Sequence, residues 1–478
     1  MDKANKKRTT IDLNDKFQDA LDLLENSTKN IFITGKAGTG KSTLLEHFRL
    51  HTKKKMVVLA PTGVAALNVK GQTIHSFFGF RPDITPQKMK RLKPTDKKAK
   101  TIKKLEMIII DEVSMVRADL LDCIDKFMRL NGKDEKKPFG GVQMVFIGDL
   151  YQLPPVVTSN EKEIFSTLYE TPYFFSSRVF GSPLSSGGVS GDSRINQQLP
   201  HLASPEPGEG IFDLEFIELE KIYRQNDKEF IGLLNAVRDN TITLKQLSAL
   251  NKRVDPGFTE GRDGFFIYLT PTNAFADAIN QKKLTELNGE TFVSNGIISG
   301  HFELQNLPTA ENLEVKVGSQ VMMLNNDSFA RWVNGSIGQI TKIQSITKYD
   351  EDLEMNVEST VVDVKLSNGK SVEVDPFTWE MYNYFFNEKK GYLDSEVVGT
   401  FTQYPMKLAW AVTIHKSQGK TFDHVILDIG NGTFAHGQTY VALSRCTSFE
   451  GLVLKKPLMK HHIFMDRRVI DFVSRYKA

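Results

Sequence analysis

The chain has 478 residues, of which 40% are hydrophobic and 25% charged, and its formal net charge is only +3. This length allows several domains, and the small net charge means that nucleic-acid affinity would have to come from local basic patches. Two cysteines without CxxC spacing argue against a disulfide framework or a structural zinc site, and no apolar run reaches the roughly 18 residues that span a bilayer, so we expect a reducing, soluble compartment and no membrane partner.

The first third of the sequence alternates apolar, β-type runs with helical patterns. The apolar runs are nearly continuous in Val, Ile and Leu: "NIFITG" (30–35), "MVVLAPT" (56–62), "LEMIIIDE" (105–112) and "MVFIGD" (144–149). Such runs are typical of strands buried on both faces, as in a parallel sheet covered by helices. We therefore predict an α/β domain over residues 1–180.

The segment "GKAGTGKS" (35–42) matches the G-x-x-x-x-G-K-[ST] pattern of a P-loop and stands between a predicted strand and a predicted helix. Its glycines allow backbone N–H groups to surround phosphate oxygens at a helix N-terminus. Lys41 would then supply positive charge to the β- and γ-phosphates of ATP, and the Ser42 hydroxyl would bind Mg²⁺. The predicted nucleotide-binding residues here are Gly35, Gly38, Thr39, Gly40, Lys41, Ser42 and Thr43.

A basic run follows an aromatic segment later in this domain. Residues 87–104 hold nine Lys/Arg and one acidic residue, shortly after "TIHSFFGF" (73–80), and we predict a small basic wedge insertion over 76–104. Exposed aromatic residues beside basic ones are typical of single-strand grooves, where each stacked base contributes roughly 1–3 kcal/mol. His75 and Phe78 are thus candidate DNA contacts, although Phe77 or Phe78 can equally belong to the core and a basic run is usually a solvated face.

Two acidic residues end the strand "MIIIDE". Asp111 can help to hold Mg²⁺, and Glu112 can accept a proton from an attacking water. An Asp-Glu pair after a strand can alternatively cap a helix, but a P-loop in the same domain favours the catalytic interpretation.

A glutamine stands between another strand and two prolines, in "FIGDLYQLPPV" (146–156). The simplest interpretation of this stretch is a turn. Beside a P-loop, however, Gln152 could contact the γ-phosphate or its attacking water, since an amide offers both a donor and an acceptor without adding negative charge. The prolines would stiffen the loop, so that a change at the phosphate is passed on.

Residues 181–210 have the composition of a linker. They contain 6 Gly, 6 Ser and 4 Pro, which leaves too little apolar surface to offset the entropy of ordering. We predict a flexible connection between two α/β domains, with an engineered or foreign insertion as the alternative.

The second half resumes the α/β pattern with "FFIYLTPTN" (265–273), "HVILDIG" (424–430) and "GLVLKK" (451–456). Between 313 and 403 apolar and polar residues alternate, with Asn-Gly turns at 334–335 and 368–369. We predict a second α/β domain in two parts, 211–312 and 404–478, with a small antiparallel β-barrel inserted at 313–403.

This half carries two arginines that could neutralise charge in a phosphoryl-transfer transition state: Arg224 in "KIYRQND" and Arg445 in "YVALSRCTS". An arginine supplied across an interface contributes about 10³–10⁵ in rate, although a lone arginine is more often part of a surface salt bridge. A second P-loop is missing, because the position five before Gly419 in "HKSQGKT" is Ile414. One ATP between the domains is the economical arrangement.

The motifs in order resemble those of superfamily 1B, RecD-like helicases, and in particular the petite-integration-frequency (PIF-type) DNA helicases. They are "GKAGTGKS", "APTGVAAL", "TIHSFFGF", "DEVSMV", "GDLYQLPPV", "YRQ", "TIHKSQGKTFD" and "YVALSR". The resemblance implies two tandem RecA-like P-loop domains with an inserted Src-homology-3-like β-barrel. It also implies 5′-to-3′ movement on single-stranded DNA, unwinding of forked duplexes, action on G-quadruplexes and RNA–DNA hybrids, and roles in DNA repair, recombination and telomere maintenance.

The resemblance also implies roles for individual residues. The catalytic set would be Lys41, Glu112, Gln152, Arg224 and Arg445, with Ser42 and Asp111 at Mg²⁺. Gln18 would contact adenine, and Gly419 would lie at the nucleotide. The DNA contacts would be Thr62, His75, Phe78, His415, Lys416 and Ser417.

Three alternatives to a DNA helicase stay open: a single-strand translocase, an RNA helicase, and a nucleotide-gated binding switch. An intact Glu112 and two candidate arginines argue against a switch, which does not need fast hydrolysis. We expect a monomer, since one chain holds both halves of the ATP site, in a bacterial cytoplasm at the nucleoid, or in the nucleus or mitochondria of a eukaryote.

Overall fold

The computed structural model describes residues 14–81, 84–157, 159–181, 212–223, 225, 227–259, 264–302, 304, 307–350, 355–387, 392–430, 432 and 435–476. The linker predicted for 181–210 lies outside these ranges except for its first residue, and Arg224 also lies outside them. None of the described helices is long and apolar enough to cross a bilayer.

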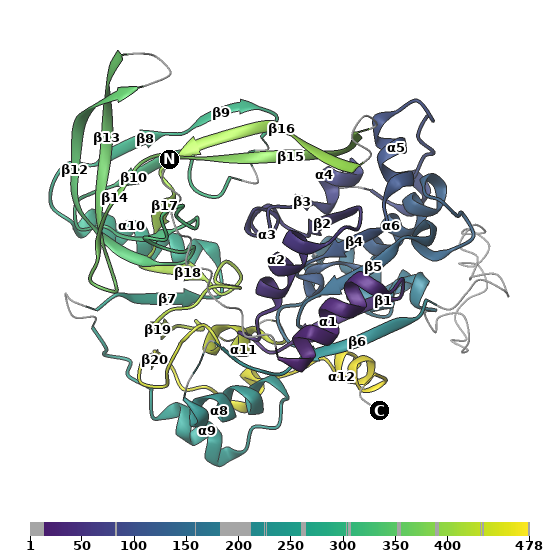
Figure 1. The fold of residues 1–478 in the computed structure, drawn as a ribbon. Helices are drawn as coiled ribbons and strands as arrows, with labels where there is room; N and C mark the ends of the chain where they lie inside the picture. Colours follow the sequence, from purple (N-terminus) through teal and green to yellow (C-terminus); the bar gives the residue numbers. More distant parts are fainter. Residues whose placement is uncertain are drawn as a thin grey trace.

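The first domain is built on a six-stranded parallel sheet of order β3-β2-β4-β5-β1-β6 (Figure 1). Its strands are β1 (Asn30–Gly35), β2 (Met56–Ala60), β3 (Gln72–Thr73), β4 (Met107–Ile110), β5 (Gln143–Ile147) and β6 (Leu214–Leu219). The four apolar runs of the sequence form β1, β2, β4 and β5, which confirms the prediction of strands buried on both faces. The RecA-like α/β class is thus confirmed for this domain.

Helices cover both faces of this sheet because alternate strand residues point to opposite sides. Ile31 and Ile33 of β1 pack with α1 (Asp15–Asn26) and α2 (Lys41–His51), whereas Phe32 packs on the opposite side with α4 (Ile74–Phe78) and α6 (Ala118–Asn131). The remaining helical elements are α3 (Gly63–Asn68), α5 (Lys97–Lys104), α7 (Ser159–Leu168) and the short turns Pro86–Lys88, Val113–Met115, Pro138–Gly141, Phe174–Ser176 and Arg178–Phe180.

Strand β6 corrects the predicted domain boundary at residue 211. It pairs in parallel with β1 along its whole length, from Asn30 beside Leu214 to Gly35 beside Leu219. Phe32 of β1 and Phe216 of β6 form an edge-to-face ring pair, with centroids 5.5 Å apart. The chain therefore completes the first sheet after residue 211 and only then enters the second domain.

The second domain has a four-stranded parallel sheet of order β18-β7-β19-β20. The strands are β18 (Ala411–Thr413), β7 (Phe266–Thr270), β19 (His424–Leu427) and β20 (Leu452–Leu454), and the helices are α8 (Lys228–Arg238), α9 (Leu244–Asn251), α10 (Asn273–Glu286) and α11 (Gln438–Leu443). The central strands β7 and β19 are separated by 153 residues of chain, counted from Thr270 to His424, which include the predicted insertion. The described strands of this sheet thus come from two parts of the chain, 266–270 and 411–454.

The C-terminal helix corrects the prediction that residues 404–478 belong entirely to the second domain. Helix α12 (Arg467–Ser474) buries Val469, Phe472 and Val473 in the hydrophobic core of the first domain. Phe472 stacks on Phe175, with ring centroids 4.3 Å apart. The chain thus returns from the second domain to the first, where α12 packs in the core.

The inserted module is antiparallel, as predicted, but it is larger than 313–403 and is not one closed barrel. Its strands are β8 (Phe292–Asn295), β9 (Ile297–Gly300), β10 (Asn312–Val315), β11 (Gln320–Met323), β12 (Ile337–Asp350), β13 (Met355–Leu366), β14 (Ser371–Val374), β15 (Phe377–Asn387), β16 (Tyr392–Gln403) and β17 (Met406–Leu408). They form sheets of five, three and two strands, and in the largest, β14-β13-β12-β11-β17, the end strands are not paired with each other.

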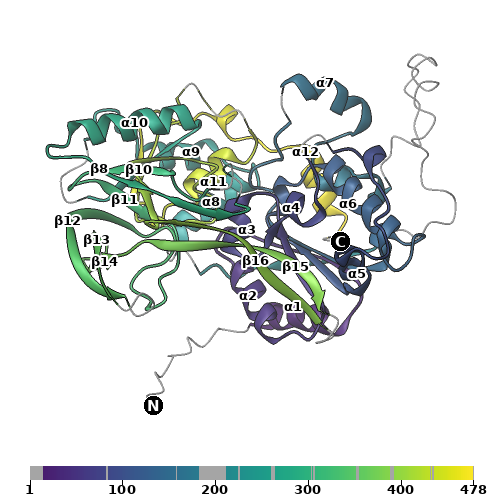
Figure 2. The ribbon, with the colours of Figure 1, turned by 90° about the horizontal axis from the view of Figure 1, so that it is seen from above.

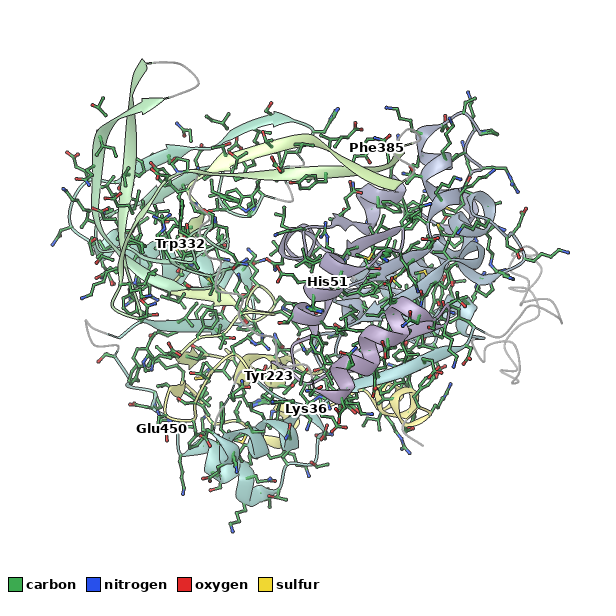
Figure 3. The ribbon with its side chains drawn as sticks, viewed as in Figure 1. Lys36, His51, Tyr223, Trp332, Phe385 and Glu450 are labelled. Atoms are coloured by element: carbon green, nitrogen blue, oxygen red, sulfur yellow. The ribbon has the colours of Figure 1, made fainter. Side chains whose placement is uncertain are left out.

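A long hairpin of this module, β15–β16, reaches from the second domain across to helix α5 of the first (Figures 1 and 2). The Lys97 ammonium on α5 lies 5.8 Å from the ring centroid of Phe385 at the far end of the hairpin. Phe385 is labelled there in Figure 3. The basic wedge predicted for 76–104 is therefore in contact with the inserted module.

Candidate nucleotide and nucleic-acid site

The P-loop lies between β1 and α2, as the motif predicts. Gly38 and Gly40 have positive φ values of 82° and 87°, a backbone conformation that side chains with a Cβ rarely adopt. At Gly35 a Cβ would lie 2.5 Å from the carbonyl oxygen of Leu219, so the close packing of β6 also requires glycine there. Gly40 caps α2 without a side-chain hydrogen bond, which leaves the first N–H groups of the helix for an anion.

The P-loop lysine points back into its own loop. The Lys41 amine donates to the carbonyl oxygens of Gly35 at 2.7 Å and Lys36 at 3.1 Å. Burial lowers the pKa of Lys41, and the nearby carboxylates of Asp149 and Glu112 oppose that shift. Among the described residues this amine bonds to carbonyl oxygens alone, which fits the role of a phosphate ligand. Thr39 is buried, with its hydroxyl bonded to Lys36, whereas Ser42 and Thr43 are exposed at the start of α2.

The acidic pair stands at the carboxyl end of β4. Asp111 is 8% exposed, and burial together with the charge of Glu112 raises its pKa to about 7. Glu112 has φ 51°, in the left-handed region that costs a residue other than glycine about 1–3 kcal/mol. The acids therefore sit side by side where a positive charge would stabilise both, which fits the predicted Mg²⁺ site.

Gln152 is buried and oriented by a carboxylate. Its side-chain amide donates to Asp149 at 3.2 Å, and its backbone N–H donates to the Asp149 carbonyl at 2.9 Å. Asp149 in turn forms a buried ion pair, 3.1 Å long, with Arg238 of α8 in the second domain. The two interpretations of this stretch, a turn and a contact of Gln152 with the γ-phosphate, are compatible, because a tight turn holds the glutamine in place. Sequence reasoning missed Arg238.

Arg445 is engaged in this structure with the loop that precedes β19. The side chain is 1% exposed and donates to the carbonyl oxygens of Val441 at 2.9 Å, Lys420 at 3.1 Å and Ser417 at 3.4 Å. Burial raises the pKa of Glu112, and the charges of Lys41 and Arg445 oppose that shift. The predicted contact with a phosphate stays a prediction, and the described geometry assigns Arg445 a structural contact with residues 417–420.

Two further residues join the halves of the site and were missed in the sequence. The Tyr440 hydroxyl on α11 accepts a hydrogen bond, 3.0 Å long, from the backbone N–H of Ala37 in the P-loop. Gln225, in the segment after β6, donates to the carbonyl oxygens of Ser444 at 3.1 Å and Cys446 at 3.3 Å. The motif "YVALSR" signalled chemistry through its arginine, but nothing local showed that its tyrosine reaches the P-loop.

The residues predicted to contact DNA lie at strand ends on both sheets. Thr62 follows β2 and caps α3, His75 lies in the first turn of α4 after β3, and His415 and Lys416 follow β18. Thr62 and Lys416 are exposed, and burial lowers the pKa of His415. The carboxyl ends of parallel strands are where open α/β sheets bind ligands. A DNA contact by these four residues stays a prediction.

Two of the predicted DNA contacts are corrected by their burial. Phe78 is 3% exposed and stacks on Phe80, and its ring also meets Phe77 and Phe127, so no base can stack on it here. Ser417 is fully buried, and its hydroxyl donates to the carbonyl oxygen of Ile414 at 2.7 Å. Both side chains stabilise the elements that carry the site instead of contacting a strand.

Comparisons with known proteins agree with this geometry. A family model described as PIF1-like helicase matches residues 12–177. The ATP-dependent DNA helicase Pif1 of Bdellovibrio bacteriovorus is 30% identical over 98% of this chain and 93% of the relative. The chain belongs to the PIF1-like helicase family. It spans only 60% and 45% of two longer relatives.

Solved structures of Bacteroides Pif1 resemble this PIF1-like helicase to different degrees. The unliganded structure is 36% identical, with a TM-score of 0.80 over 98% of this chain and 97% of the other. A structure in complex with ADP-AlF3 and single-stranded DNA is 35% identical over 97% of both chains, but its TM-score is 0.65. This structure is therefore more similar overall to the unliganded structure than to the one with ADP-AlF3 and single-stranded DNA.

Two exposed side chains near the P-loop of this PIF1-like helicase, Tyr223 and Gln18, are candidates for contact with the adenine base. Gln18 is exposed on α1. Tyr223 is 45% exposed, and a Cβ atom at Gly40 would lie 3.7 Å from its ring. The backbone N–H of Tyr223 donates to the Gly38 carbonyl at 2.9 Å. Tyr223 and Lys36 are labelled close together in Figure 3.

We expect the exposed ring of Tyr223 to stack on the adenine base of ATP. A Tyr223→Ala variant is therefore expected to raise the KM for ATP about 5- to 150-fold with little change in kcat, because a stacked base contributes roughly 1–3 kcal/mol. Steady-state ATP hydrolysis at saturating single-stranded DNA measures both constants. Tyr223→Phe, which keeps the ring, is the matched control and should keep a wild-type KM. An unchanged KM in Tyr223→Ala would show that the ring does not contact the base.

Proposed function

We propose that this chain is an ATP-dependent DNA helicase that couples ATP hydrolysis between its two α/β domains to 5′-to-3′ movement on single-stranded DNA. The observation that carries the proposal is the contact between Ala37 of the P-loop and Tyr440 of the second domain. A nucleotide bound at the P-loop must meet this face of the second domain, so binding and hydrolysis change the domain contact. Cyclic change of that contact is the motion that a translocating motor needs.

The catalytic roles follow from the positions of the side chains. Lys41 would bind the β- and γ-phosphates, Glu112 would accept the proton of the attacking water, and Gln152 would contact the γ-phosphate. Ser42 and Asp111 would hold Mg²⁺, whose remaining ligands would be phosphate oxygens and water. Arg445 and Arg224 stay candidates for stabilising the transition state.

Support for the substrate comes from the relatives. The Bdellovibrio relative is named an ATP-dependent DNA helicase, and solved Pif1 structures are described with single-stranded DNA and with forked duplex DNA. We propose single-stranded and forked DNA as the substrates, with G-quadruplexes and RNA–DNA hybrids as further ones. Work on DNA would place the protein at a bacterial nucleoid, or in the nucleus or mitochondria of a eukaryotic cell.

The test compares two duplexes of identical sequence, one with a 5′ and one with a 3′ single-stranded tail, in ATP and Mg²⁺. We expect the wild type to open only the 5′-tailed duplex. Lys41→Ala, which removes the phosphate-binding charge, is expected to open neither and to lose ATP hydrolysis, while Lys36→Ala in the same loop controls for the loss of a lysine.

Opening of only the 3′-tailed duplex would contradict the proposed direction and keep the motor. If the wild type opened neither duplex while DNA still stimulated its ATP hydrolysis, the chain would be a translocase and not a helicase. Absence of any ATP hydrolysis would overturn the proposal.

A further inference from the structure

The loop between β18 and β19 carries a glutamine that the sequence analysis did not single out. Tight backbone hydrogen bonds shape this loop: Ser417 N–H donates to Thr413 at 3.0 Å, Gln418 N–H to His415 at 3.2 Å and Lys420 N–H to Ser417 at 3.0 Å. The loop is therefore a compact turn, and it fixes the direction in which Gln418 leaves the backbone.

Arg445 stabilises the same loop through hydrogen bonds to its backbone. Its guanidinium donates to the carbonyl oxygens of Ser417 and Lys420, one on each side of Gln418, at 3.4 and 3.1 Å. Because Arg445 is almost fully buried, these hydrogen bonds are shielded from water. Gln418 is thus presented to the first domain by a rigid support.

The side chain of Gln418 crosses to the first domain and contacts two of the predicted catalytic residues. Its Nε2 donates to Glu112 Oε2 at 3.1 Å and to Gln152 Oε1 at 3.2 Å. Both partners are oxygen acceptors, so the amide nitrogen must face them, which settles the orientation of the amide. A single side chain of the second domain therefore bonds to both the candidate general base, Glu112, and the candidate γ-phosphate contact, Gln152.

The other end of the amide has a buried acceptor. Gln418 Oε1 is buried, and no hydrogen-bond donor reaches it from the described residues. Buried acceptors are nearly always paired in folded proteins. During the reaction the attacking water must lie beside Glu112. It donates one hydrogen to this base, and its second hydrogen is available for a hydrogen bond to Gln418 Oε1.

We propose that Gln418 positions the hydrolytic water: Nε2 holds Glu112 and Gln152 in place, and Oε1 accepts the second hydrogen of the water that attacks the γ-phosphate. This inference rests on the proposed ATP hydrolysis. It makes the reaction dependent on the second domain, because the base and the water are aligned only while the loop 414–420 lies against β4 and β5.

The test measures kcat and KM of ATP hydrolysis at saturating single-stranded DNA for two variants of Gln418. Gln418→Ala removes both functions of the amide and is expected to lower kcat about 10²-fold, the effect of a small misplacement in an active site. Gln418→Glu keeps the shape, replaces the donor by a negative charge against Glu112, and is expected to be at least as slow. KM for ATP should change less than about threefold. Gln339→Ala, an exposed glutamine on β12, is the matched control.

A double-variant cycle separates positioning from a general loss of structure. In a Glu112→Gln background the base is already absent, so adding Gln418→Ala is expected to change kcat less than about twofold. If the second substitution lowers kcat by its full single-variant factor, Gln418 acts independently of Glu112 and the inference is overturned.

The remaining outcomes are also decisive. Wild-type kcat in both Gln418 variants would overturn this inference while leaving the proposed function intact. A wild type that does not hydrolyse ATP at all would instead overturn the proposed function. If Gln418→Ala proved unstable in thermal unfolding, the isosteric Gln418→Glu would carry the test, and wild-type kcat in that variant would overturn the inference.

Discussion

A Glu112→Gln variant is expected to bind ATP like the wild type but to hydrolyse it about 10²–10⁴ times more slowly, the contribution typical of a general base. The amide has the same shape as the carboxylate but cannot accept the proton of the attacking water. Burial raises the pKa of Glu112 and the charge of Lys41 lowers it, so the carboxylate depends on its cationic neighbours to stay ionised. Phosphate release at saturating DNA measures kcat, and titration with a fluorescent ATP analogue measures binding.

Glu135→Gln is the matched control for that variant. The Glu135 side chain is 60% exposed and pairs with Arg91 at the surface, so its loss should leave kcat unchanged. Retention of wild-type kcat in Glu112→Gln would show that another group takes the proton. Function on DNA that survived the loss of hydrolysis would instead return the nucleotide-gated switch to consideration.

An Arg238→Ala variant is expected to destabilise the packing of the second domain on the first by about 3–5 kcal/mol, the cost of removing one partner of a buried ion pair. Arg238 and Asp149 have side chains that are only 3% and 0% exposed, and the guanidinium also lies 3.8 Å from the ring centroid of Tyr151. Removing the arginine leaves the Asp149 carboxylate buried without its cation. Since Asp149 also orients Gln152, kcat for ATP hydrolysis should fall as well.

Urea unfolding monitored by tryptophan fluorescence measures this effect, because all three tryptophans lie between residues 332 and 410. They therefore report on the second domain and its inserted module. Arg91→Ala removes an exposed pair and should cost less than about 1 kcal/mol. If Arg238→Ala is no more destabilising than Arg91→Ala, the ion pair does not hold the domains together.

Local patterns in the sequence determined the first-domain half of the site. A β-type run, a glycine-rich loop and a helical pattern are each made by residues close in the chain, so "NIFITGKAGTGKS" could be assigned as β1, P-loop and α2. Glu112 and Gln152 follow the neighbouring strands β4 and β5, and the strand order β4-β5-β1 brings them to the P-loop. The carboxyl ends of parallel strands share one edge of a sheet, and this rule made the grouping predictable.

Composition and pattern did not reveal which sheet a strand joins or which face of an aromatic helix is covered. "LEFIEL" predicts a strand equally well in either domain, and only its pairing with β1 places it in the first sheet. Nor does the local sequence show that α12 and Phe78 are buried in the core of the first domain, because their burial depends on the segments that pack against them.

Contacts between the domains were decided by the tertiary structure alone. Gln418 lies 306 residues from Glu112 and 266 from Gln152, and Arg238 lies 89 residues from Asp149. Such pairs leave no periodicity or spacing in one sequence, because each partner is an ordinary polar residue in its own segment. The sequence by itself determined which chemistry the chain carries, whereas the packing of the second domain on the first decided which side chains complete it.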